Sequence, residues 1–416
     1  MKRWPAGIAA VAAAAAWLAH VSNGWALYEP YRLRDPSRRW EVTLGTSVGY
    51  DDNINTVEQN PTSSFTTSVE PELLLNVPFE QSFLGLRYRY NLAYYDQRIA
   101  NQIDQSHSAD VLYSHTFSPR FSLDLQNQFR HGLNPDLVQV VAGVPLVTEL
   151  RGNYNYDALS GTLSYGLTRR CSISLDAGWE YWRFDEAKAS MDNDRNSDRI
   201  GISSLYAVSP RFQVGGGYRY TRTDYREDLR IPVSFFVQVI SAEARSSDTH
   251  EGFLAVVGRF NPQLSGRLTV GGQFQEFGDG TQSSSPSVDS SLTYNYGPQN
   301  TITAGFRYSI RSAELSEFRS SESALLYGEI GHWITSRCRA ALSGSYNIDM
   351  FQNPTVTLPP PVPDSEDSLS VSLGLTYEFR SWCRATCNFT HTEVTSDLVS
   401  RSFQRNVVGV GVRFIY

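Results

Sequence analysis

Several features that are common in other protein classes are scarce or missing in this chain of 416 residues. After the N-terminus there is no run of about 20 apolar residues, which excludes a protein that crosses a membrane with helices. Only 3 Met occur against 23 Tyr, 21 Phe and 30 Gly, and this balance favours strands over helices. No linker or shift of composition marks a domain boundary. No basic tail or patch is present, which argues against nucleic acid as a partner.

The first residues have the pattern of an export signal. A lysine and an arginine follow the first methionine, residues 6–19 form a short apolar core, and Gly-Trp-Ala at 24–26 has the spacing of a cleavage site. We therefore expect a signal peptide over residues 1–26, with Leu27 as the new N-terminus. The apolar core is too short for an uncleaved membrane anchor. Since Leu27 is not a cysteine, the pattern is not that of a lipoprotein. Export implies an oxidising compartment.

The rest of the chain is a series of runs in which apolar and polar residues alternate. Residues 84–92 carry leucine or tyrosine at every second position, with Gly, Arg or Asn between them, and 301–311 and 407–416 repeat the pattern. A period of two indicates a strand with one apolar and one polar face. About eighteen such runs follow one another. They start near Trp40, Phe65, Leu84, Ser108, Phe121, Leu159, Ser172, Arg199, Phe212, Gly252, Leu264, Val288, Thr301, Ala324, Cys338, Leu369, Cys383 and Gln404.

The connections alternate in length, with tight turns such as Ser118-Pro119-Arg120 and long polar loops such as 130–156 and 223–249. In lipid every backbone N–H and C=O must pair within the protein, so only helices and closed barrels can span a membrane. The sequence predicts an all-β fold, a transmembrane antiparallel up-and-down β-barrel of about 18 strands (16–18) over residues 38–416. Short periplasmic turns, long extracellular loops and a short periplasmic segment at 27–37 complete it.

This barrel belongs in the outer membrane of a Gram-negative bacterium, with membrane lipid as its surroundings. A soluble sandwich or propeller also has many strands, but it would not combine an export signal with alternating long and short connections. Aromatic residues gather near the strand ends, as in the girdles of membrane barrels. They are Phe79, Phe117, Phe121, Phe212, Trp333 and Trp382 on the turn side, and Tyr50, Tyr94, Trp179, Tyr220 and Tyr308 on the loop side.

Arginine almost replaces lysine after the signal, with 33 Arg but only Lys188. Nine arginines fall on the polar faces of predicted strands and are expected to line the lumen: Arg87, Arg89, Arg219, Arg267, Arg307, Arg311, Arg384, Arg405 and Arg413. Arginine makes bidentate contacts with carboxylates and phosphates, so these side chains could guide an acidic sugar polymer or a small anion. The alternative is that they brace the wall by pairing with lumenal acids, for which the candidates are Asp124, Asp176, Glu180, Asp289 and Glu378.

Residues that could carry chemistry form no recognisable site. The six histidines after the signal lie in no catalytic or zinc signature, and no P-loop or Gly-x-Ser-x-Gly occurs. We therefore expect no enzyme, no cofactor and no metal. The segment Asp192 to Asp198 spaces its oxygens as calcium loops do, but the glycine is absent and Ser203 stands where the closing Glu belongs. A solvated loop is the simpler interpretation.

The four cysteines are Cys171, Cys338, Cys383 and Cys387. Cys383 and Cys387 lie four residues apart on one strand, too far to form a disulfide, and an intervening strand separates Cys338 from Cys383. We expect all four to face lipid as small apolar residues.

Short motifs resemble those of a known family. The opening Val48-Gly49-Tyr50-Asp51-Asp52-Asn53-Ile54, the Ser-Pro-Arg-Phe turns at 118–121 and 209–212, and the end Arg413-Phe414-Ile415-Tyr416 look like the putative β-barrel porin 2 family. That family includes the EpsL-like outer-membrane proteins of exopolysaccharide operons. The resemblance implies a barrel over about residues 38–416 and a link to polysaccharide, and it carries no catalytic residues. The aromatic end, Phe414 and Tyr416, is similar to the signal read by the β-barrel assembly machinery.

The leading hypothesis is a passive outer-membrane channel for hydrophilic or small anionic solutes, or an export conduit for an exopolysaccharide. The runner-up is a plugged barrel that is structural or whose loops bind glycan or a partner, and a third is an enzyme carried on a loop. The segments 138–147 and 231–240 are too apolar for plain exposed loops. They extend into a hairpin above the membrane or fold into the lumen, and the sequence does not decide between these. By analogy with porins of this size, a homo-oligomer is a further expectation. A TonB-type plug is not expected, since about a dozen residues separate the predicted cleavage site from the first strand.

Overall fold

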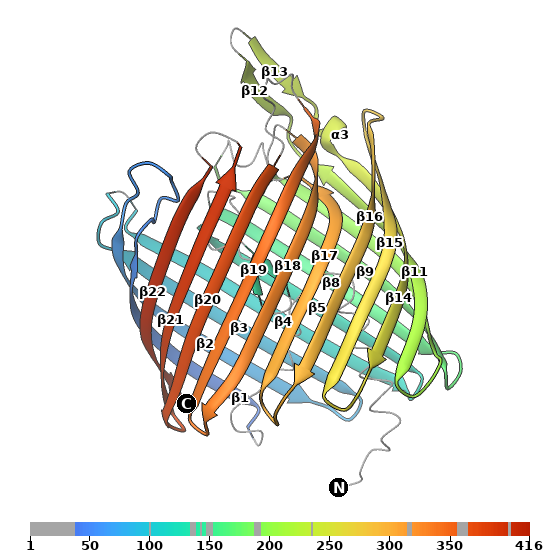
Figure 1. The fold of residues 1–416 in the computed structure, drawn as a ribbon, viewed down its shortest axis with the longest axis horizontal. Helices are drawn as coiled ribbons and strands as arrows, with labels where there is room; N and C mark the ends of the chain where they lie inside the picture. Colours follow the sequence, from blue (N-terminus) through green and yellow to red (C-terminus); the bar gives the residue numbers. More distant parts are fainter. Residues whose placement is uncertain are drawn as a thin grey trace.

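The computed structural model describes residues 38–99, 101–133, 139–141, 144–146, 153–186, 193–233, 236–313, 318–355, 365–397 and 401–416. The signal peptide predicted for 1–26 and the segment 27–37 lie outside these residues. Eighteen strands form one closed sheet in which every strand pairs antiparallel with its neighbours along the chain, and the last strand, β22, pairs with the first, β1. The predicted up-and-down barrel and its strand number are confirmed (Figure 1).

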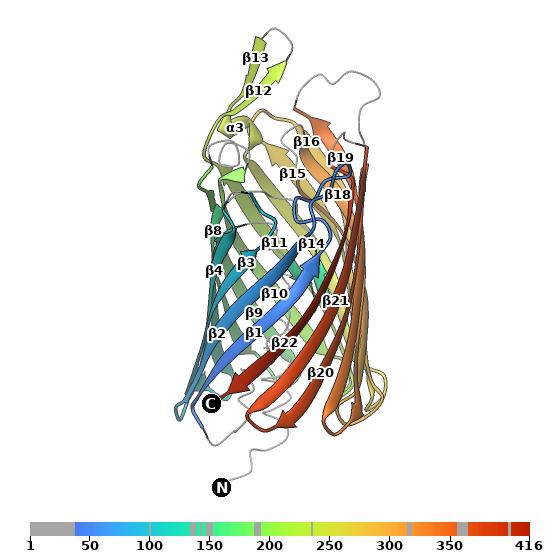
Figure 2. The ribbon, with the colours of Figure 1, turned by 90° about the vertical axis from the view of Figure 1, so that its left-hand side faces the viewer.

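The strands of the barrel are, in order around the wall, β1 (Trp40–Asp51), β2 (Ser64–Pro78), β3 (Ser82–Tyr95), β4 (Ile103–Ser118), β5 (Phe121–Leu133), β8 (Asn153–Gly166), β9 (Cys171–Phe184), β10 (Arg195–Ala207), β11 (Phe212–Tyr225), β14 (Ser247–Arg259), β15 (Leu264–Phe277), β16 (Gln282–Asn295), β17 (Thr301–Ser312), β18 (Phe318–Thr335), β19 (Cys338–Pro354), β20 (Ser365–Arg380), β21 (Cys383–Ser396) and β22 (Phe403–Ile415). The short connections lie at one rim, here called the turn rim, together with the C-terminus, and the long ones lie at the opposite loop rim (Figures 1 and 2).

Alternation along each strand sets which side chains face outward. On β1, Val42 and Leu44 are 39% and 44% exposed, whereas Glu41 and Thr43 between them are buried. This polarity is the reverse of a soluble protein, because the apolar side chains point away from the barrel and the polar ones point into it. Among the described residues, no helix has the length and apolar character needed to cross a membrane.

Several strands that begin at the loop rim start earlier than the alternation predicts. Strand β8 begins at Asn153 instead of Leu159, and β16 begins at Gln282 instead of Val288. Residues 282–287 are Gln, Ser and Pro only, so no apolar face marks them as strand. They pair nevertheless, because the neighbouring strand β15 continues to the same height. Backbone pairing therefore extends beyond the apolar band.

The aromatic residues at the rims largely face outward. Phe79, Phe117 and Trp382 are exposed at the turn rim, and Tyr50 and Tyr94 at the loop rim. The prediction for Trp333 is wrong. This residue pairs with Arg339 and alternates with the exposed Ile334, so its side chain is on the inner face of β18.

The two apolar loop segments form two different hairpins. Strands β12 (Leu229–Val233) and β13 (Phe236–Ile240), followed by the one-turn helix α3 (Ala242–Arg245), rise above the loop rim (Figures 1 and 2). Strands β6 (Gln139–Val141) and β7 (Val144–Leu146) belong to the connection from β5 to β8. Residues of β7 come within 8 Å, between Cα atoms, of β18 and β19.

The position of β7 places the β6–β7 hairpin on the far side of the barrel from its own strands. Strand β18 is the ninth strand from β5 around a ring of eighteen, and β19 is the ninth from β8. In Figures 1 and 2 the hairpin lies at the height of the barrel wall, below the loop rim. One apolar segment therefore enters the lumen, and the other extends outside.

Candidate functional site

Polar side chains make up most of the inner wall of the barrel. Serines 283, 285 and 287 of β16 are buried side chains of this wall, as are Ser345, Asn347 and Asp349 of β19. Small hydroxyls and amides leave space in the lumen and can hydrogen-bond to water or to a polar solute. A barrel whose interior forms an apolar core would instead carry large apolar side chains at these positions.

The nine arginines expected at the lumen lie on inner-face positions, and seven of them form ion pairs with carboxylates of the same wall. The pairs are Arg87–Glu72 (2.7 Å), Arg89–Glu72 (3.5 Å), Arg219–Glu251 (2.6 Å), Arg307–Asp289 (2.9 Å), Arg405–Asp51 (2.5 Å), Arg311–Asp349 and Arg413–Glu70. A guanidinium of Arg267 donates to Thr269 at 3.1 Å. Arg384 lies in register between Glu378 and Arg413.

Three arginines and two glutamates form a cluster across the seam of the barrel. Arg413 of β22 contacts both Glu70 and Glu72 of β2, although β1 lies between these two strands. Arg413 reaches over Gly45 of β1, where a β-carbon would stand in ordinary contact with it, 3.5 Å from Nε of Arg413. Arg87 and Arg89 approach Glu72 from the other side.

The loop-rim end of the seam is held by charged and polar contacts. Arg405 of β22 donates to both carboxylate oxygens of Asp51 on β1, and the backbone N–H of Asn406 donates to Asp52 at 2.7 Å. The Asp51 side chain is buried. These contacts join the first and last strands, which are 354 residues apart in sequence.

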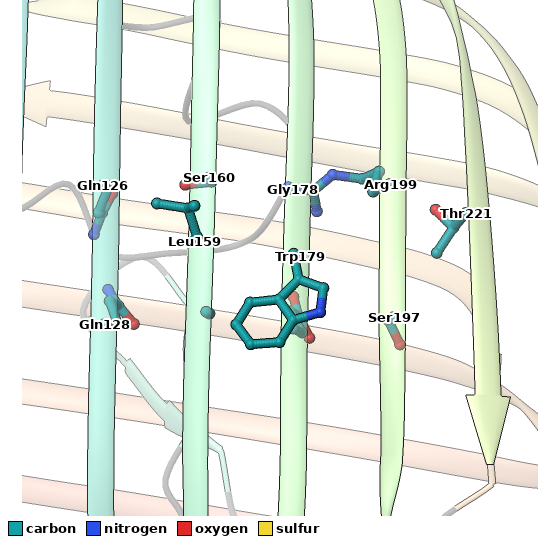
Figure 3. A pocket seen from close by; sticks show the side chains of 11 residues that line it. Gln126, Gln128, Leu159, Ser160, Gly178, Trp179, Ser197, Arg199 and Thr221 are labelled. Carbon is teal, nitrogen blue, oxygen red and sulfur yellow. The ribbon is translucent and has the colours of Figure 1, made fainter. Parts of the chain in front are cut away.

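The wall also carries a cavity of about 140 Å³ on β5 and β8 to β11. We call it the wall pocket. The polar side chains that line it include Gln126, Gln128, Ser160, Glu180, Arg199 and Thr221. Figure 3 shows the guanidinium of Arg199 reaching from β10 towards Gly178 on β9. A β-carbon at Gly178 would lie only 2.7 Å from Nη2 of Arg199, so the absence of a side chain makes room for the guanidinium.

An aromatic cluster borders the wall pocket on the loop-rim side. Tyr154, Tyr156, Trp182 and Phe184 project from the inner faces of β8 and β9, and all four are buried. Arg195 lies over the Trp182 ring at 5.5 Å from its centroid. Sequence reasoning missed this cluster. The signal was present in residues 153–157, where tyrosine alternates with Asn and Asp.

Of the acidic residues expected to brace the wall, Asp289 forms the pair described above, and Glu378 lies opposite Arg384. Asp124, Asp176 and Glu180 lie on inner-face positions of β5 and β9. Most carboxylates that pair with the nine arginines were not foreseen: Asp51, Glu70, Glu72, Glu251 and Asp349. Their pairing depends on which residues lie side by side on neighbouring strands.

Asp192 of the calcium-like segment lies outside the described residues, and the side chains of Asp194 and Asp198 do not point to one place. Oδ1 of the buried Asp194 accepts a hydrogen bond from the N–H of Phe184 at 2.7 Å. Asp198 pairs in register with the outward-facing Trp179 and is exposed. The part of the chain that the structure describes holds no group of three His, Cys, Asp or Glu residues placed to bind a metal ion.

The four cysteines are free thiols. Cys171 lies opposite Tyr206 and Cys383 lies opposite Phe414, and both aromatic partners are exposed on the outer face. Cys387, opposite the exposed Val410, is itself exposed. These positions are those expected of small lipid-facing residues.

The aromatic end of the chain lies on the outer surface at the turn rim. Tyr416 is 75% exposed, and its ring lies 5.8 Å from that of Trp40. The Phe414 ring stacks on Trp382 at 6.2 Å. The backbone of Tyr416 exchanges two hydrogen bonds with Val42 of β1, so the last residue completes the closure of the barrel.

The model of a protein family described as "Putative beta-barrel porin 2" matches residues 41–416. No curated protein matches the chain. Among solved structures, OccK11 (OpdR) of Pseudomonas aeruginosa is similar at 12% identity and a TM-score of 0.47, covering 91% of this chain and 96% of that one. The outer membrane protein opdK of the same organism gives 9% identity, a TM-score of 0.47 and coverages of 91% and 99%. OccAB4 of Acinetobacter baumannii gives 10% identity and a TM-score of 0.43, covering 92% of this chain and 100% of that one.

Proposed function

Because the chain belongs to the putative β-barrel porin 2 family, we propose that it is a passive, non-enzymatic channel through the outer membrane of a Gram-negative bacterium. Hydrophilic solutes, small anions among them, would cross through its lumen. The observation that carries this proposal is the reversed polarity of the wall. Apolar side chains cover the outside, and hydroxyls, amides and paired charges cover the inside.

The paired arginines bear on which ions the channel would prefer. A guanidinium with a carboxylate at 2.6 to 2.9 Å, as in Arg219–Glu251 and Arg307–Asp289, adds little net charge to the lumen. Its remaining N–H groups can still donate to a passing anion. We therefore expect a preference for anions that is modest, since the carboxylates offset most of the field of the arginines.

The finer proposal is that the barrel serves as a conduit in exopolysaccharide export. Family resemblance motivates it, and the chemistry of the wall supports it. Ser, Thr, Gln and Asn side chains can exchange hydrogen bonds with a polyhydroxylated chain without holding it tightly. Conduction needs such weak and repeated contacts, because a solute must leave each site as readily as it enters.

The test of channel function is single-channel conductance of the refolded barrel in a planar bilayer, with a salt gradient to give the ion selectivity. We expect stable conductance steps with a modest anion preference. Arg307→Ala or Arg87→Ala should reduce that preference, whereas Arg222→Ala, whose exposed pair with Asp224 lies on the outer face, should not. A correctly folded barrel that gives no steps would sink the open-channel proposal.

A plugged barrel is the second candidate, and the β6–β7 hairpin favours it. Strand β7 lies near β18 and β19, on the wall opposite the strands to which the hairpin is connected, and this position supports a narrowed or closed lumen. In that case the protein would be structural or would bind glycan or a partner through its loops. Conductance that appears only after removal of this hairpin would select the second candidate over the first.

A further inference from the structure

We propose that the wall pocket is a binding subsite for one ring of an uncharged saccharide. This inference rests on the proposed channel function, because the subsite opens on the lumen that the solute would travel. It assigns a substrate class to a place on the wall. Seven of its eleven lining residues carry polar side chains, and the others are Ala158, Leu159, Gly178 and Trp179. These residues come from five consecutive strands of the barrel and surround a cavity of about 140 Å³.

Strand register brings these side chains together in two rows across the wall. In the first row, Gln126, Ser160, Gly178, Arg199 and Thr221 lie side by side from β5 to β11. In the second row, Gln128, Ala158, Glu180, Ser197 and Thr223 do the same, two residues closer to the loop rim. Neighbouring residues of a row are about 5 Å apart and the rows are about 7 Å apart. The two rows therefore offer many polar groups over the area of a single sugar ring.

The groups in the wall pocket match hydroxyls on a ring. Gln126 and Gln128 each carry amide donors and an acceptor, and Ser160 and Thr221 carry hydroxyls that donate and accept. A sugar hydroxyl both donates and accepts, so a site that offers both kinds of group can satisfy several hydroxyls at once. A purely cationic patch would instead select anions.

Charge within the wall pocket is close to balanced, which points to an uncharged saccharide. Glu180, Arg219 and Asp176 all lie within electrostatic range of the Arg199 guanidinium. The Arg199 side chain crosses to Gly178 on the strand that carries these two acids (Figure 3). An acidic sugar would meet two guanidinium groups, those of Arg199 and Arg219, together with two carboxylates, and would gain little from charge.

Small residues form the floor of the wall pocket, and aromatic rings support one side. Ala158, Ser160 and Gly178 keep its centre open. Tyr156 and Trp182, in the next row towards the loop rim, are buried. They therefore back the pocket rather than line it. Ligand pockets typically measure about 300–1,000 Å³, so this cavity suits one ring of a longer chain, and binding should be weak.

The experiment is isothermal titration calorimetry of the refolded full-length mature barrel in detergent, with maltotriose and cellotriose as neutral probes and a trigalacturonate as the acidic one. We expect dissociation constants on the order of millimolar for at least one neutral probe, as a subsite with few hydrogen bonds allows. The acidic probe should bind no more tightly. Gln126→Leu removes one amide and keeps the volume, and it should weaken binding about fivefold.

Filling the pocket is the sharper test. Gly178→Val should abolish the heat of binding that calorimetry measures for the neutral sugars, because the valine side chain would occupy the pocket. Its matched control is Gly331→Val on β18, outside the wall pocket. Gly331 is also a wall glycine beside an arginine, since a β-carbon there would lie 3.2 Å from Nη2 of Arg339. If both valine variants bind as the wild type does, or if no neutral probe binds, the subsite is wrong. Tighter binding of trigalacturonate would overturn its assignment to uncharged sugars.

Calorimetry separates this inference from the channel proposal, because it needs no ion flow. If the barrel binds neutral sugar through the wall pocket but gives no conductance steps, the subsite proposal stands and the channel proposal is wrong. If the barrel conducts but binds no neutral sugar, the channel proposal stands and the subsite proposal is wrong. With both intact, added neutral sugar should interrupt the single-channel current in the wild type and in Gly331→Val but not in Gly178→Val.

Discussion

An arginine held against a carboxylate on the inner wall stabilises the barrel and keeps the local charge small. The cluster at the seam shows why such pairs matter to folding. Glu72 is buried, and Arg87, Arg89 and Arg413 all contact it. A buried carboxylate that loses a partner keeps the cost of its desolvation without the compensating interaction.

Arg413→Ala should therefore lower the free energy of unfolding by about 1–3 kcal/mol. The measurement is denaturant unfolding of the refolded barrel in detergent micelles or lipid vesicles. Arg222→Ala provides the comparison. It removes an ion pair of 2.9 Å whose side chains are 57% and 41% exposed, and exposed pairs contribute about 0–1 kcal/mol. Equal effects of the two substitutions would show that the seam cluster contributes no more than a surface pair.

Tyr416 raises a different question, because its side chain is exposed whereas its backbone closes the sheet. We predict that Tyr416→Ala lowers the amount of assembled barrel in cells if the assembly machinery reads this ring. The refolded barrel should keep its stability within about 0.5 kcal/mol, as is usual for exposed positions. Tyr377→Ala, another exposed outward tyrosine on β20, should leave both quantities unchanged. If the Tyr416→Ala variant assembles normally, the assembly machinery does not read this ring.

At the level of elements, deletion of the β6–β7 hairpin can be compared with deletion of the β12–β13 hairpin. Deletion of residues 139–146, bridged by Gly and Ser, should raise the single-channel conductance about twofold or more, since the narrowest section of a pore limits ion flow. We expect the β6–β7 hairpin to provide such a section, because β7 lies near β18 and β19, opposite the strands to which the hairpin is connected. Deletion of residues 230–239 removes much of β12 and β13 above the loop rim and should leave the conductance unchanged.

The same planar-bilayer recordings check both deletions, with slower gel migration after heating as evidence that each barrel has folded. An unchanged conductance in the first deletion would show that the hairpin does not constrict the pore. An equal increase in both deletions would point to a general effect of shortened loops.

Strand number and strand faces were predictable because each strand carries its own evidence. Alternation in 84–92 or 301–311 needs no knowledge of the neighbouring strand. The positions of segments 138–147 and 231–240, inside the lumen or above the loop rim, were not predictable in this way, because both are short apolar segments within long loops. What distinguishes the two hairpins is contact with distant strands, such as that of β7 with β18 and β19.

The partners of the arginines were hidden for a related reason. Arg413 and Glu70 are 343 residues apart in sequence and meet because β22, β1 and β2 are adjacent and in register. The wall pocket likewise depends on the register of five strands. An alternating sequence tells which face a side chain occupies, but a shift of two residues in one strand would change every lateral neighbour and leave that face the same.

For the whole molecule, closure is the property on which the others depend. Every strand of the ring has two neighbours, so no edge is left with unpaired backbone groups. The contacts of Arg405 with Asp51 and of Asn406 with Asp52 secure the last pairing. A closed wall with polar side chains inside then encloses charges of both signs, and their balance should set ion selectivity.

This balance predicts opposite effects from the two halves of one ion pair. Arg307→Gln takes one positive charge from beside Asp289 and should move the reversal potential towards cations. Asp289→Asn takes one negative charge from beside Arg307 and should move the potential towards anions by a similar amount. The double variant should return close to the wild-type value, because it removes both charges from one place. Reversal potentials under a salt gradient measure all three. If Arg307 instead guided anions on its own, Asp289→Asn would have little effect and the double variant would behave like Arg307→Gln. The cycle therefore separates a wall of balanced pairs from a row of independent cations.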